Sequence, residues 1–183
     1  MEETRKRDSA SGLYEWVEAL LLAVVLVVLV FTFLWRVVTV DGPSMQPTLH
    51  NGDKLVLYSQ AYRNPQQGDI VVITQPNSRN EPLIKRIVAK EGQTVDIDFE
   101  QGTVTVDGTV LQEDYIQEPT HNPTSAPVSF PLTVPKGCVF VLGDNRNNST
   151  DSRSREIGLI DERYILGKAV FRLFPIDSFG TVK

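Results

Sequence analysis

An uncharged apolar run near the N-terminus sets the strongest limit on how this chain can fold. From Ala19 to Trp35 the chain has 17 residues without a charge, almost all of them Leu, Val, Ala or Phe. This length is at the short end for a helix that spans a bilayer, and Trp16 and Trp35 frame the run as interfacial aromatic residues do. The run ends in Phe-Leu-Trp-Arg, without the small residues of a signal-peptide cleavage site. We therefore predict a retained transmembrane anchor over residues 17–36.

The basic residues around the anchor predict its orientation. Three cations lie at positions 5–7, whereas Arg36 and Lys54 are the first two after the run. Lysine and arginine close to a span are retained on the cytoplasmic side. We therefore predict a cytoplasmic tail over residues 1–16 and an extracytoplasmic domain over residues 37–183, which makes this a single-pass protein of the cell membrane.

Composition and charge exclude several classes of function. The formal net charge is −5 and no basic cluster of useful length is present, so we expect no nucleic-acid partner. Cys138 is the only cysteine, which rules out an intramolecular disulfide and a cysteine-based metal site. Beside a strand-like segment, it is expected to be a small buried hydrophobe. His50 and His121 lie far apart in the sequence and give poor support for a zinc site or a Ser-His-Asp triad.

After the anchor the hydrophobic pattern changes to a period of two, with turn residues at short intervals. Short, punctuated strands of this kind are typical of an antiparallel, mainly β domain with a barrel-like or sandwich-like form. Asn51-Gly52 is a turn signal, and Asp107-Gly108 is the strongest hairpin signal in the chain. A helical turn is expected only between Asp161 and Leu166. The predicted strands are residues 37–40, 54–58, 69–74, 83–89, 103–106, 109–111, 139–142 and 168–174.

Residues 113–135 interrupt this pattern. Proline recurs at every fourth position from Pro119 to Pro135, which forbids a helix and favours an extended segment. An SH3-ligand motif is a second interpretation of the same prolines. We predict an extended excursion over the surface of the β domain, with no repeat and no second domain.

A serine between two prolines lies just beyond the anchor, in the segment Gly42-Pro43-Ser44-Met45-Gln46-Pro47-Thr48-Leu49. Proline fixes its own φ and drives the preceding residue towards extended geometry, and Gly42 allows a sharp turn. The chain from Arg36 to Ser44 reaches only about 28 Å when fully extended, so Ser44 must lie at or near the outer membrane surface. It belongs either to an ordinary turn or to a nucleophile that needs a base from elsewhere in the chain.

Lys85 and Arg86 are adjacent cations in the predicted strand 83–89. Neighbouring side chains of a strand point to opposite faces, so we expect one of these cations to lie against apolar surface. A desolvated lysine can lose its proton, whereas arginine stays charged. A fall in the lysine pKa from about 10.4 to about 8 corresponds to roughly 3 kcal/mol, which burial can supply. A neutral Lys85 near Ser44 would be a general base; the alternative is a solvated edge strand with both cations exposed.

The segment from Gly143 to Arg153 is the third polar cluster and directly follows an apolar strand. Its Asp, Asn, Ser and Thr side chains can bond to the backbone and form a tight loop, and its alternating Asp and Arg residues can form ion pairs. The spacing and terminal glutamate of an EF-hand are absent, which excludes a calcium loop of that kind. The loop is either structural or carries a hydroxyl that orients a catalytic group.

Together these stretches resemble the type I signal peptidases of peptidase family S26, membrane-bound serine endopeptidases that remove signal peptides from exported proteins. The resemblance covers nearly the whole chain, the anchor included. It implies a β fold of the signal-peptidase and LexA-like type, in the compact form found in Gram-positive-type bacteria. The matching segments, in order, are Ser44-Met45-Gln46-Pro47-Thr48-Leu49, Gly68-Asp69-Ile70-Val71-Val72, Lys85-Arg86-Ile87-Val88-Ala89 and Gly143-Asp144-Asn145-Arg146 through Ser149, Asp151, Ser152 and Arg153.

The resemblance implies a Ser/Lys dyad in which Ser44 is the acylating nucleophile and Lys85 is the general base. The backbone N–H of Ser44 is the implied oxyanion donor. Some family members add a serine hydroxyl two residues before the nucleophile, where this chain has Gly42, so a second donor must come from the backbone or from water. One such donor can be worth about 3 kcal/mol.

The loop after Gly143 matches the supporting positions of the family. Ser149 matches the serine whose hydroxyl orients the lysine. Asp151 and Arg153 match an ion pair that stiffens the site, and Asp144 and Arg146 occupy further supporting places.

The implied partners are secretory preproteins, cut after Ala-x-Ala-type sites that shallow pockets select. The signal peptide is expected to bind as an added, extended strand beside the segments that bear Ser44 and Lys85. The resemblance implies work at the lipid surface near the protein-export translocon, and no metal or organic cofactor.

Two other interpretations fit parts of the sequence. A membrane-tethered β domain that binds extracellular peptides without cleaving them would explain the anchor, the hairpin and the proline-rich segment. A self-cleaving Ser-Lys protease of the repressor type would share the two residue types, but the spanning segment and the outward orientation speak against it. Only the joint presence of Ser44, Lys85 and the Ser149 loop separates an enzyme from a binding domain.

Overall fold

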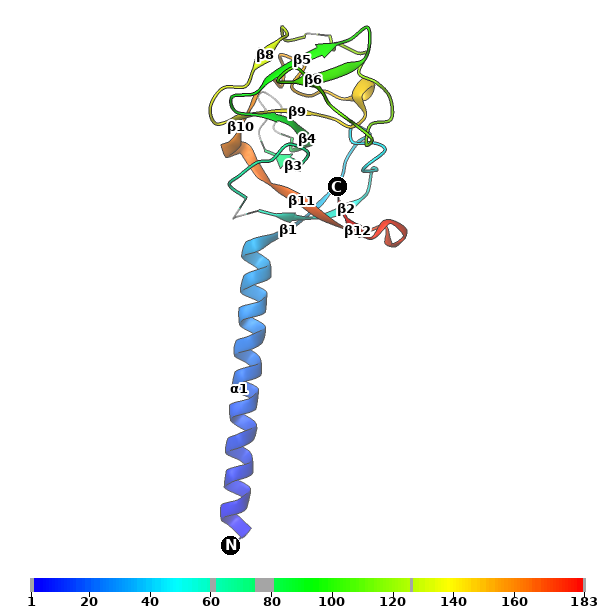
Figure 1. The fold of residues 1–183 in the computed structure, drawn as a ribbon. Coiled ribbons are helices and arrows are strands. Elements are labelled where there is room, and N and C mark those ends of the chain that lie inside the picture. The colour runs from blue at the N-terminus through cyan, green and yellow to red at the C-terminus, as the bar shows by residue number, and fades with distance from the viewer. Residues whose placement is uncertain (1, 60–61, 75–80, 126, 183) are drawn as a thin grey trace.

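The structure, a computed structural model, describes residues 2–59, 62–74, 81–125 and 127–182. A single long helix projects from one end of a β domain, as Figure 1 shows. This confirms the prediction of a mainly antiparallel β domain preceded by one N-terminal helix. The domain is built from two sheets and three short 3-10 helices.

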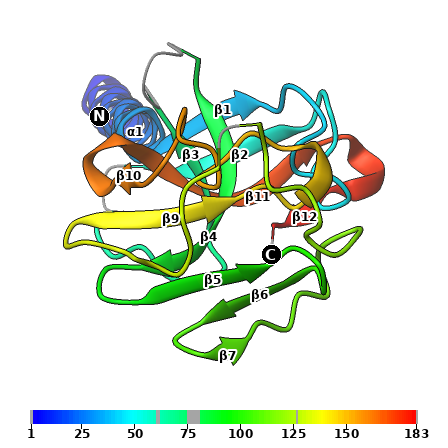
Figure 2. The ribbon, with the colours of Figure 1, turned by 90° about the horizontal axis from the view of Figure 1, so that it is seen from above.

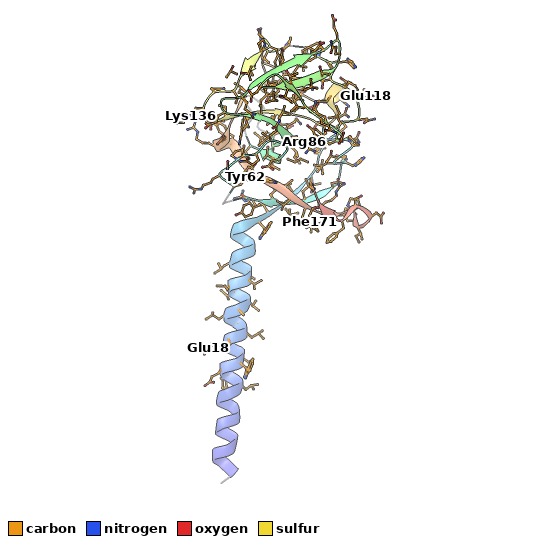
Figure 3. The ribbon with its side chains drawn as sticks, in the orientation of Figure 1. Glu18, Tyr62, Arg86, Glu118, Lys136 and Phe171 are labelled. Atoms are coloured by element: carbon orange, nitrogen blue, oxygen red, sulfur yellow. The ribbon has the colours of Figure 1, made fainter. Side chains whose placement is uncertain are left out.

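Helix α1 (Glu2–Leu34) carries the apolar run. Its stretch Gly12–Leu29 is long and apolar enough to cross a membrane. The described side chains from Leu13 to Leu29 are exposed, and they stand out from the helix on several sides in Figure 3. The helix ends at Leu34 because the chain then pairs as a strand, so Trp35 and Arg36 belong to the β domain.

The larger sheet is antiparallel and has eight strands in the order β1-β2-β11-β3-β4-β9-β10, with β12 paired to β11. This order puts β4 in the interior, between β3 and β9, and leaves β1 at an edge. The strands are β1 (Trp35–Thr39), β2 (Lys54–Tyr58), β3 (Ile70–Ile73), β4 (Leu83–Lys90), β9 (Cys138–Leu142), β10 (Ile160–Asp161), β11 (Ile165–Phe174) and β12 (Gly180–Thr181).

The smaller sheet has four antiparallel strands in the order β7-β6-β5-β8 and lies beside β4 and β9, as the view from above in Figure 2 shows. A shared apolar core joins the two sheets, with Val88 of β4, Val95 of the smaller sheet and Phe140 of β9 among its buried members. Cys138 packs partly buried against this core, as expected of a small hydrophobe. The strands are β5 (Thr94–Asp98), β6 (Thr103–Val106), β7 (Thr109–Val110) and β8 (Leu132–Thr133).

Each predicted strand matches an observed one to within a few residues, and the hairpin prediction is confirmed. Asp107 and Gly108 both have positive φ, 52° and 76°, the backbone geometry of a tight hairpin turn between β6 and β7. Strand β5 is missing from the prediction, although its Thr-Val-Asp-Ile-Asp sequence alternates as a half-buried strand should. The helical turn expected near Asp161 is a 3-10 helix over Glu162–Tyr164.

The proline-rich residues 113–135 form neither a helix nor a domain. Their only regular strand within the described residues is β8, which pairs with β5. Elsewhere the segment runs as irregular chain, and Pro127 forms a bridge to Ser154. The segment thus links the smaller sheet to the polar loop of residues 143–153.

Candidate active site

The loop that bears Ser44 is a long connection between the paired strands β1 and β2. Backbone bonds from Val40 N to Asp53 O and from Gly52 N to Val40 O close its base, and Gln46 N donates to Pro43 O in the turn around the serine. Met45 and Leu49 are fully buried in an apolar core formed with β2, β3 and β11. Because this core holds the loop on the C-terminal side of Ser44, the hydroxyl has a fixed place on the domain.

Strand β4 carries Lys85 and lies between β3 and β9, and different apolar clusters cover its two faces, one around Ile87 and the other around Val88. Lys85 is 2% exposed and Arg86 is 3% exposed. The alternative of an edge strand with two solvated cations is therefore wrong, since both cations are buried. Lys85 Nζ donates to Ile84 O at 3.0 Å and lies 2.8 Å from Ser44 Oγ.

Burial changes the proton affinity of this lysine. Desolvation lowers the pKa of Lys85 to about 8, against an opposing rise from the charges of Asp151 and Asp144 and a further lowering by Arg153. Lys85 forms no ion pair with any acid of the described chain. With this pKa, about a tenth of the molecules carry a neutral lysine at pH 7 and about half do at pH 8, and the lone pair of the neutral amine can accept the proton of a nearby hydroxyl.

Arg86 points away from Lys85 and binds a carboxylate of the polar loop. Its Nε and Nη2 donate to the two oxygens of Asp144 at 2.8 and 2.7 Å, a bidentate pair in which Asp144 is fully buried. Thr48 donates its hydroxyl to the same carboxylate at 2.5 Å. Asp144 thus joins the strand of Lys85 to the loop of Ser44. Figure 3 shows Arg86 within the body of the β domain.

The polar loop is stiffened by a second buried pair. Arg153 Nε and Nη2 donate to the carboxylate of Asp151 at 2.8 and 2.9 Å, and Gly143 N donates to the same group at 3.0 Å. Burial alone would raise the pKa of Asp151, but these bonds and the arginine charge hold it below its usual value. Asp151 is therefore an anion, and Arg153 also donates to Arg146 O across the loop.

Gly143 lies against both Ser149 and the backbone of the nucleophile. A Cβ at Gly143 would be 2.2 Å from Ser149 Oγ and 2.5 Å from Ser44 O, so only glycine fits between them. Ser149 Oγ is buried and forms no well-aligned hydrogen bond in the described part of the chain, although the hydroxyl contributes to the low pKa of Asp151. The structure therefore puts Ser149 at the site without a direct bond to Lys85.

The remaining predicted residue, Arg146, pairs with a residue that the sequence did not single out. Arg146 donates from both of its terminal nitrogens to the carboxylate of Glu113, at 2.5 and 2.7 Å, and does not pair with Asp144. The Tyr115 hydroxyl donates to Glu113 at 2.9 Å. The guanidinium of Arg86 lies 3.9 Å from the centre of the Tyr115 ring. Glu113 and Tyr115 lie at the start of the proline-rich segment 113–135, before its first proline, where no motif marks them. Among the described residues of the site, the buried Arg86, Arg146 and Arg153 each pair with an acid, whereas the buried Lys85 has no such partner.

A groove of about 490 Å³ opens beside the Ser44 hydroxyl and Lys85. The residues just before the serine form one of its walls, and the residues just before the lysine form the other. Its lining is largely aliphatic, with Val38, Val40, Met45, Val72, Leu83 and Ile84 among its members. The groove can therefore hold an apolar, extended segment that ends at the serine.

The backbone around Ser44 decides which donors are free. Gly42 N donates to Asn51 Oδ1 at 3.0 Å, so its N–H is already used within the loop. No acceptor for the Ser44 N–H is found among the described residues. The same part of the chain holds no group of three or more His, Cys, Asp or Glu residues that could bind a metal ion.

Known proteins with similar sequences share one description. The family described as signal peptidase, peptidase S26, matches residues 13–174. The signal peptidase I of Bacillus licheniformis is 35% identical over 185 residues, which cover 97% of this chain and 97% of its own length. A probable signal peptidase I-1 of Synechocystis sp. is 39% identical over 175 residues, which cover 91% of this chain and 85% of its own.

A crystal structure of a signal peptidase I from Enterococcus faecalis V583 is 30% identical to this chain. It aligns with 58% of this chain and 97% of its own, with a TM-score of 0.48. The family match and the curated relatives both extend over nearly the whole chain. The chain therefore belongs to the signal peptidase family, peptidase S26, and is a serine endopeptidase of the signal peptidase I type that cleaves signal peptides.

Proposed function

We propose that Ser44 and Lys85 are the catalytic dyad of this peptidase. The observation that carries the proposal is the 2.8 Å separation of Ser44 Oγ from Lys85 Nζ, within the hydrogen-bond reach that proton transfer needs. The burial of Lys85 and its lowered pKa of about 8 make the neutral amine accessible in the resting enzyme, in a fraction that grows as the pH rises towards 8. A serine has too high a pKa to attack unaided, and an adjacent base removes this barrier.

The reaction proceeds by acyl transfer in two halves. Neutral Lys85 takes the proton of Ser44 as Oγ forms a bond to the scissile carbonyl carbon. The C–N bond then breaks, the resulting ammonium of Lys85 returns its proton to the leaving amine, and the mature protein departs. In the second half Lys85 takes a proton from water, the hydroxide attacks the ester, and the proton restores the Ser44 hydroxyl as the signal peptide leaves as a carboxylate.

The backbone N–H of Ser44 is the proposed donor to the oxyanion. Its lack of an acceptor among the described residues supports this role, because a free, fixed N–H can stabilise the negative charge that develops in the transition state. The bond from Gly42 N to Asn51 argues against Gly42 as the second donor. That donor is then another backbone group or a water molecule.

The polar loop holds the dyad in place. In this proposal Asp144 joins the loop of Ser44 to the strand of Lys85 through Thr48 and Arg86, as its bonds suggest. Asp151 and Arg153 fix the backbone at Gly143, and Arg146 anchors the same loop to Glu113. Ser149 orients Lys85 once a substrate has closed the site, since apo hydrogen bonds at catalytic groups are often loose.

The groove beside the dyad takes the signal peptide in an extended form. Its walls are segments 38–41 and 81–84, and a peptide added between them would bond to main chain on either side. Strand β1 is an edge strand, which leaves one side open to such pairing. Small side chains at the first and third positions before the cut, as in Ala-x-Ala, are the proposed specificity. Secretory preproteins are the substrates.

The proposed location is the outer face of the cell membrane. Helix α1 anchors the chain with its N-terminus in the cytoplasm, as the cations at positions 5–7 suggest, and the domain lies next to the helix end in Figure 1. A short connection through β1 keeps Ser44 close to the lipid surface. Preproteins that emerge from the export translocon would meet the groove there.

The test is cleavage of a preprotein by the full chain in lipid, with the cut located by sequencing the new N-terminus. The proposal expects one cut after Ala-x-Ala and none when Ala at the first position is replaced by a bulky residue. Binding of the preprotein without a cut would support a peptide-binding domain and would overturn the proposal.

A further inference from the structure

A second hollow lies next to the site, and its lining is polar. It has a volume of about 350 Å³, and none of the nine described residues that line it has an apolar side chain. Asn122, Thr124, Asn148, Ser149 and Glu156 are among them. The walls come from two places: the proline-rich segment and the loop that follows Gly143. The aliphatic groove beside Ser44 has a different chemical character.

The wall of this hollow reaches the backbone of the nucleophile. Ser149 lines the hollow, and its hydroxyl and Ser44 O both lie within 2.6 Å of the place that a Cβ of Gly143 would take. Asn145 N also donates to Ser44 O at 3.0 Å, which ties the loop to the serine. Ser44 lines the groove and Ser149 lines the hollow, and Gly143 lies close to both residues.

The hollow contains unused hydrogen-bonding capacity. Two buried hydroxyls of lining residues, Thr124 Oγ1 and Ser149 Oγ, form no well-aligned hydrogen bond in the described part of the chain, although the Ser149 hydroxyl interacts with the carboxylate of Asp151. Buried polar groups of proteins nearly always have a partner. Thr124 also has a φ of 73°, a left-handed conformation that a β-branched residue rarely adopts, and such outliers gather at ligand sites. Both features point to a polar ligand.

We propose that this hollow binds the residues that follow the scissile bond, the N-terminal segment of the mature protein, as an extended polar peptide. The inference rests on the proposed function of Ser44. A peptide held at the nucleophile leaves it in two directions, and the aliphatic groove takes the apolar signal-peptide side. The hollow then receives the other side, where hydroxyl and amide groups can bond to peptide backbone and to polar side chains.

The proposal predicts a preference for polar over bulky apolar residues just after the cut. Asn148 is exposed, makes no side-chain bond within the described chain and lies outside the catalytic machinery. Asn148→Leu should therefore leave the fold and the dyad unchanged while it removes polar capacity from the hollow. A matched control is Gln101→Leu, which puts the same apolar side chain on an exposed turn of the smaller sheet.

The test compares two substrates with the same signal-peptide side, using the full chain in lipid. One continues for four polar residues beyond the cut, and the other ends in an anilide directly after it. Asn148→Leu should lower kcat/KM for the long substrate by about three- to tenfold, through KM, which corresponds to the loss of one hydrogen bond. The anilide should be cleaved at the rate of the native chain, and Gln101→Leu should change neither rate.

A third substrate, with leucine at the second and third positions after the cut, gives the reverse readout. The ratio of kcat/KM for this substrate to kcat/KM for the polar substrate should be higher for Asn148→Leu than for the native chain. Equal changes on the long substrate and the anilide, or no change on either, would overturn the proposal while the proposed function stands. A native chain that cleaves none of the three would overturn both.

Discussion

Lys85 Nζ lies 2.8 Å from Ser44 Oγ, although 41 positions separate the two residues in the chain. Two features of the fold bring them together. The loop of Ser44 is held on the sheet by Met45 and Leu49, and Lys85 stands on an interior strand of the same sheet. Asp144 then joins the two segments by accepting from Thr48 and Arg86. The dyad is therefore fixed by buried contacts on both sides.

The rate of cleavage should depend on pH through Lys85. Its pKa of about 8 means that the ammonium, which cannot accept a proton, dominates at lower pH. We expect kcat/KM to rise by about tenfold per pH unit below the pKa and to level off above it. A profile measured with one peptide substrate checks this. A flat profile between about pH 6 and pH 10 would contradict a lysine base.

The same burial should make stability depend on pH. A lysine whose pKa is lowered on folding destabilises the protein fully below the folded pKa, and this penalty disappears as the pH rises to the unfolded value. The free energy of unfolding should rise between pH 8 and pH 10.5, by about 3 kcal/mol for this group.

Lys85→Met should lack that rise. The difference between native and variant chains, measured by denaturant titration at several pH values, isolates the contribution because all other groups titrate in both. Parallel curves for the two chains would show that Lys85 is not desolvated.

Asp144→Asn should damage both stability and the pH profile. The substitution removes the carboxylate charge that pairs with the buried Arg86, and the loss of one partner from a buried pair costs roughly 3–5 kcal/mol. It also removes a charge that raises the pKa of Lys85, so the rising limb of the rate profile should move to lower pH. Asp161→Asn is the control, because its partner Arg163 is 84% exposed, and we expect no change in the profile. A shift of the Asp144→Asn limb to higher pH would refute the assigned electrostatics.

Gly143→Ala should inactivate the enzyme by steric displacement. The added Cβ would lie 2.2 Å from Ser149 Oγ and 2.5 Å from Ser44 O, so the loop or the nucleophile must move. Gly108→Ala is the control: it meets no atom within 4 Å, and its positive φ costs about 1 kcal/mol of stability without an effect on turnover. Comparable activity in both variants would show that the close packing of Gly143 against Ser149 and Ser44 is unimportant.

Much of this fold can be predicted from local sequence. The apolar run predicts helix α1, and period-two alternation predicts the strands that bear or flank the site. Asp107-Gly108 predicts its hairpin because both residues tolerate positive φ. Strand β5 fits the same rule and escaped prediction because its alternate positions are acidic, which resembles a surface loop.

The candidate site was harder to predict, because its contacts join distant segments. The resemblance named Ser44 and Lys85, but no local pattern shows that β4 is an interior strand, and so the burial of Arg86 was not foreseen. Glu113 and Tyr115 lie in no motif, and their roles depend on how the excursion packs against Arg146. Partner choice among buried charges is a tertiary property.

The dyad is tested most directly by turnover of a preprotein in lipid by Ser44→Ala, Lys85→Ala and the double variant. Residues that act as one unit lose activity together, so each single substitution should abolish cleavage and the double variant should be no worse. Lys85→Arg should be inactive as well, because arginine keeps its proton. Turnover at the native rate in Ser44→Ala or in Lys85→Ala would contradict the account.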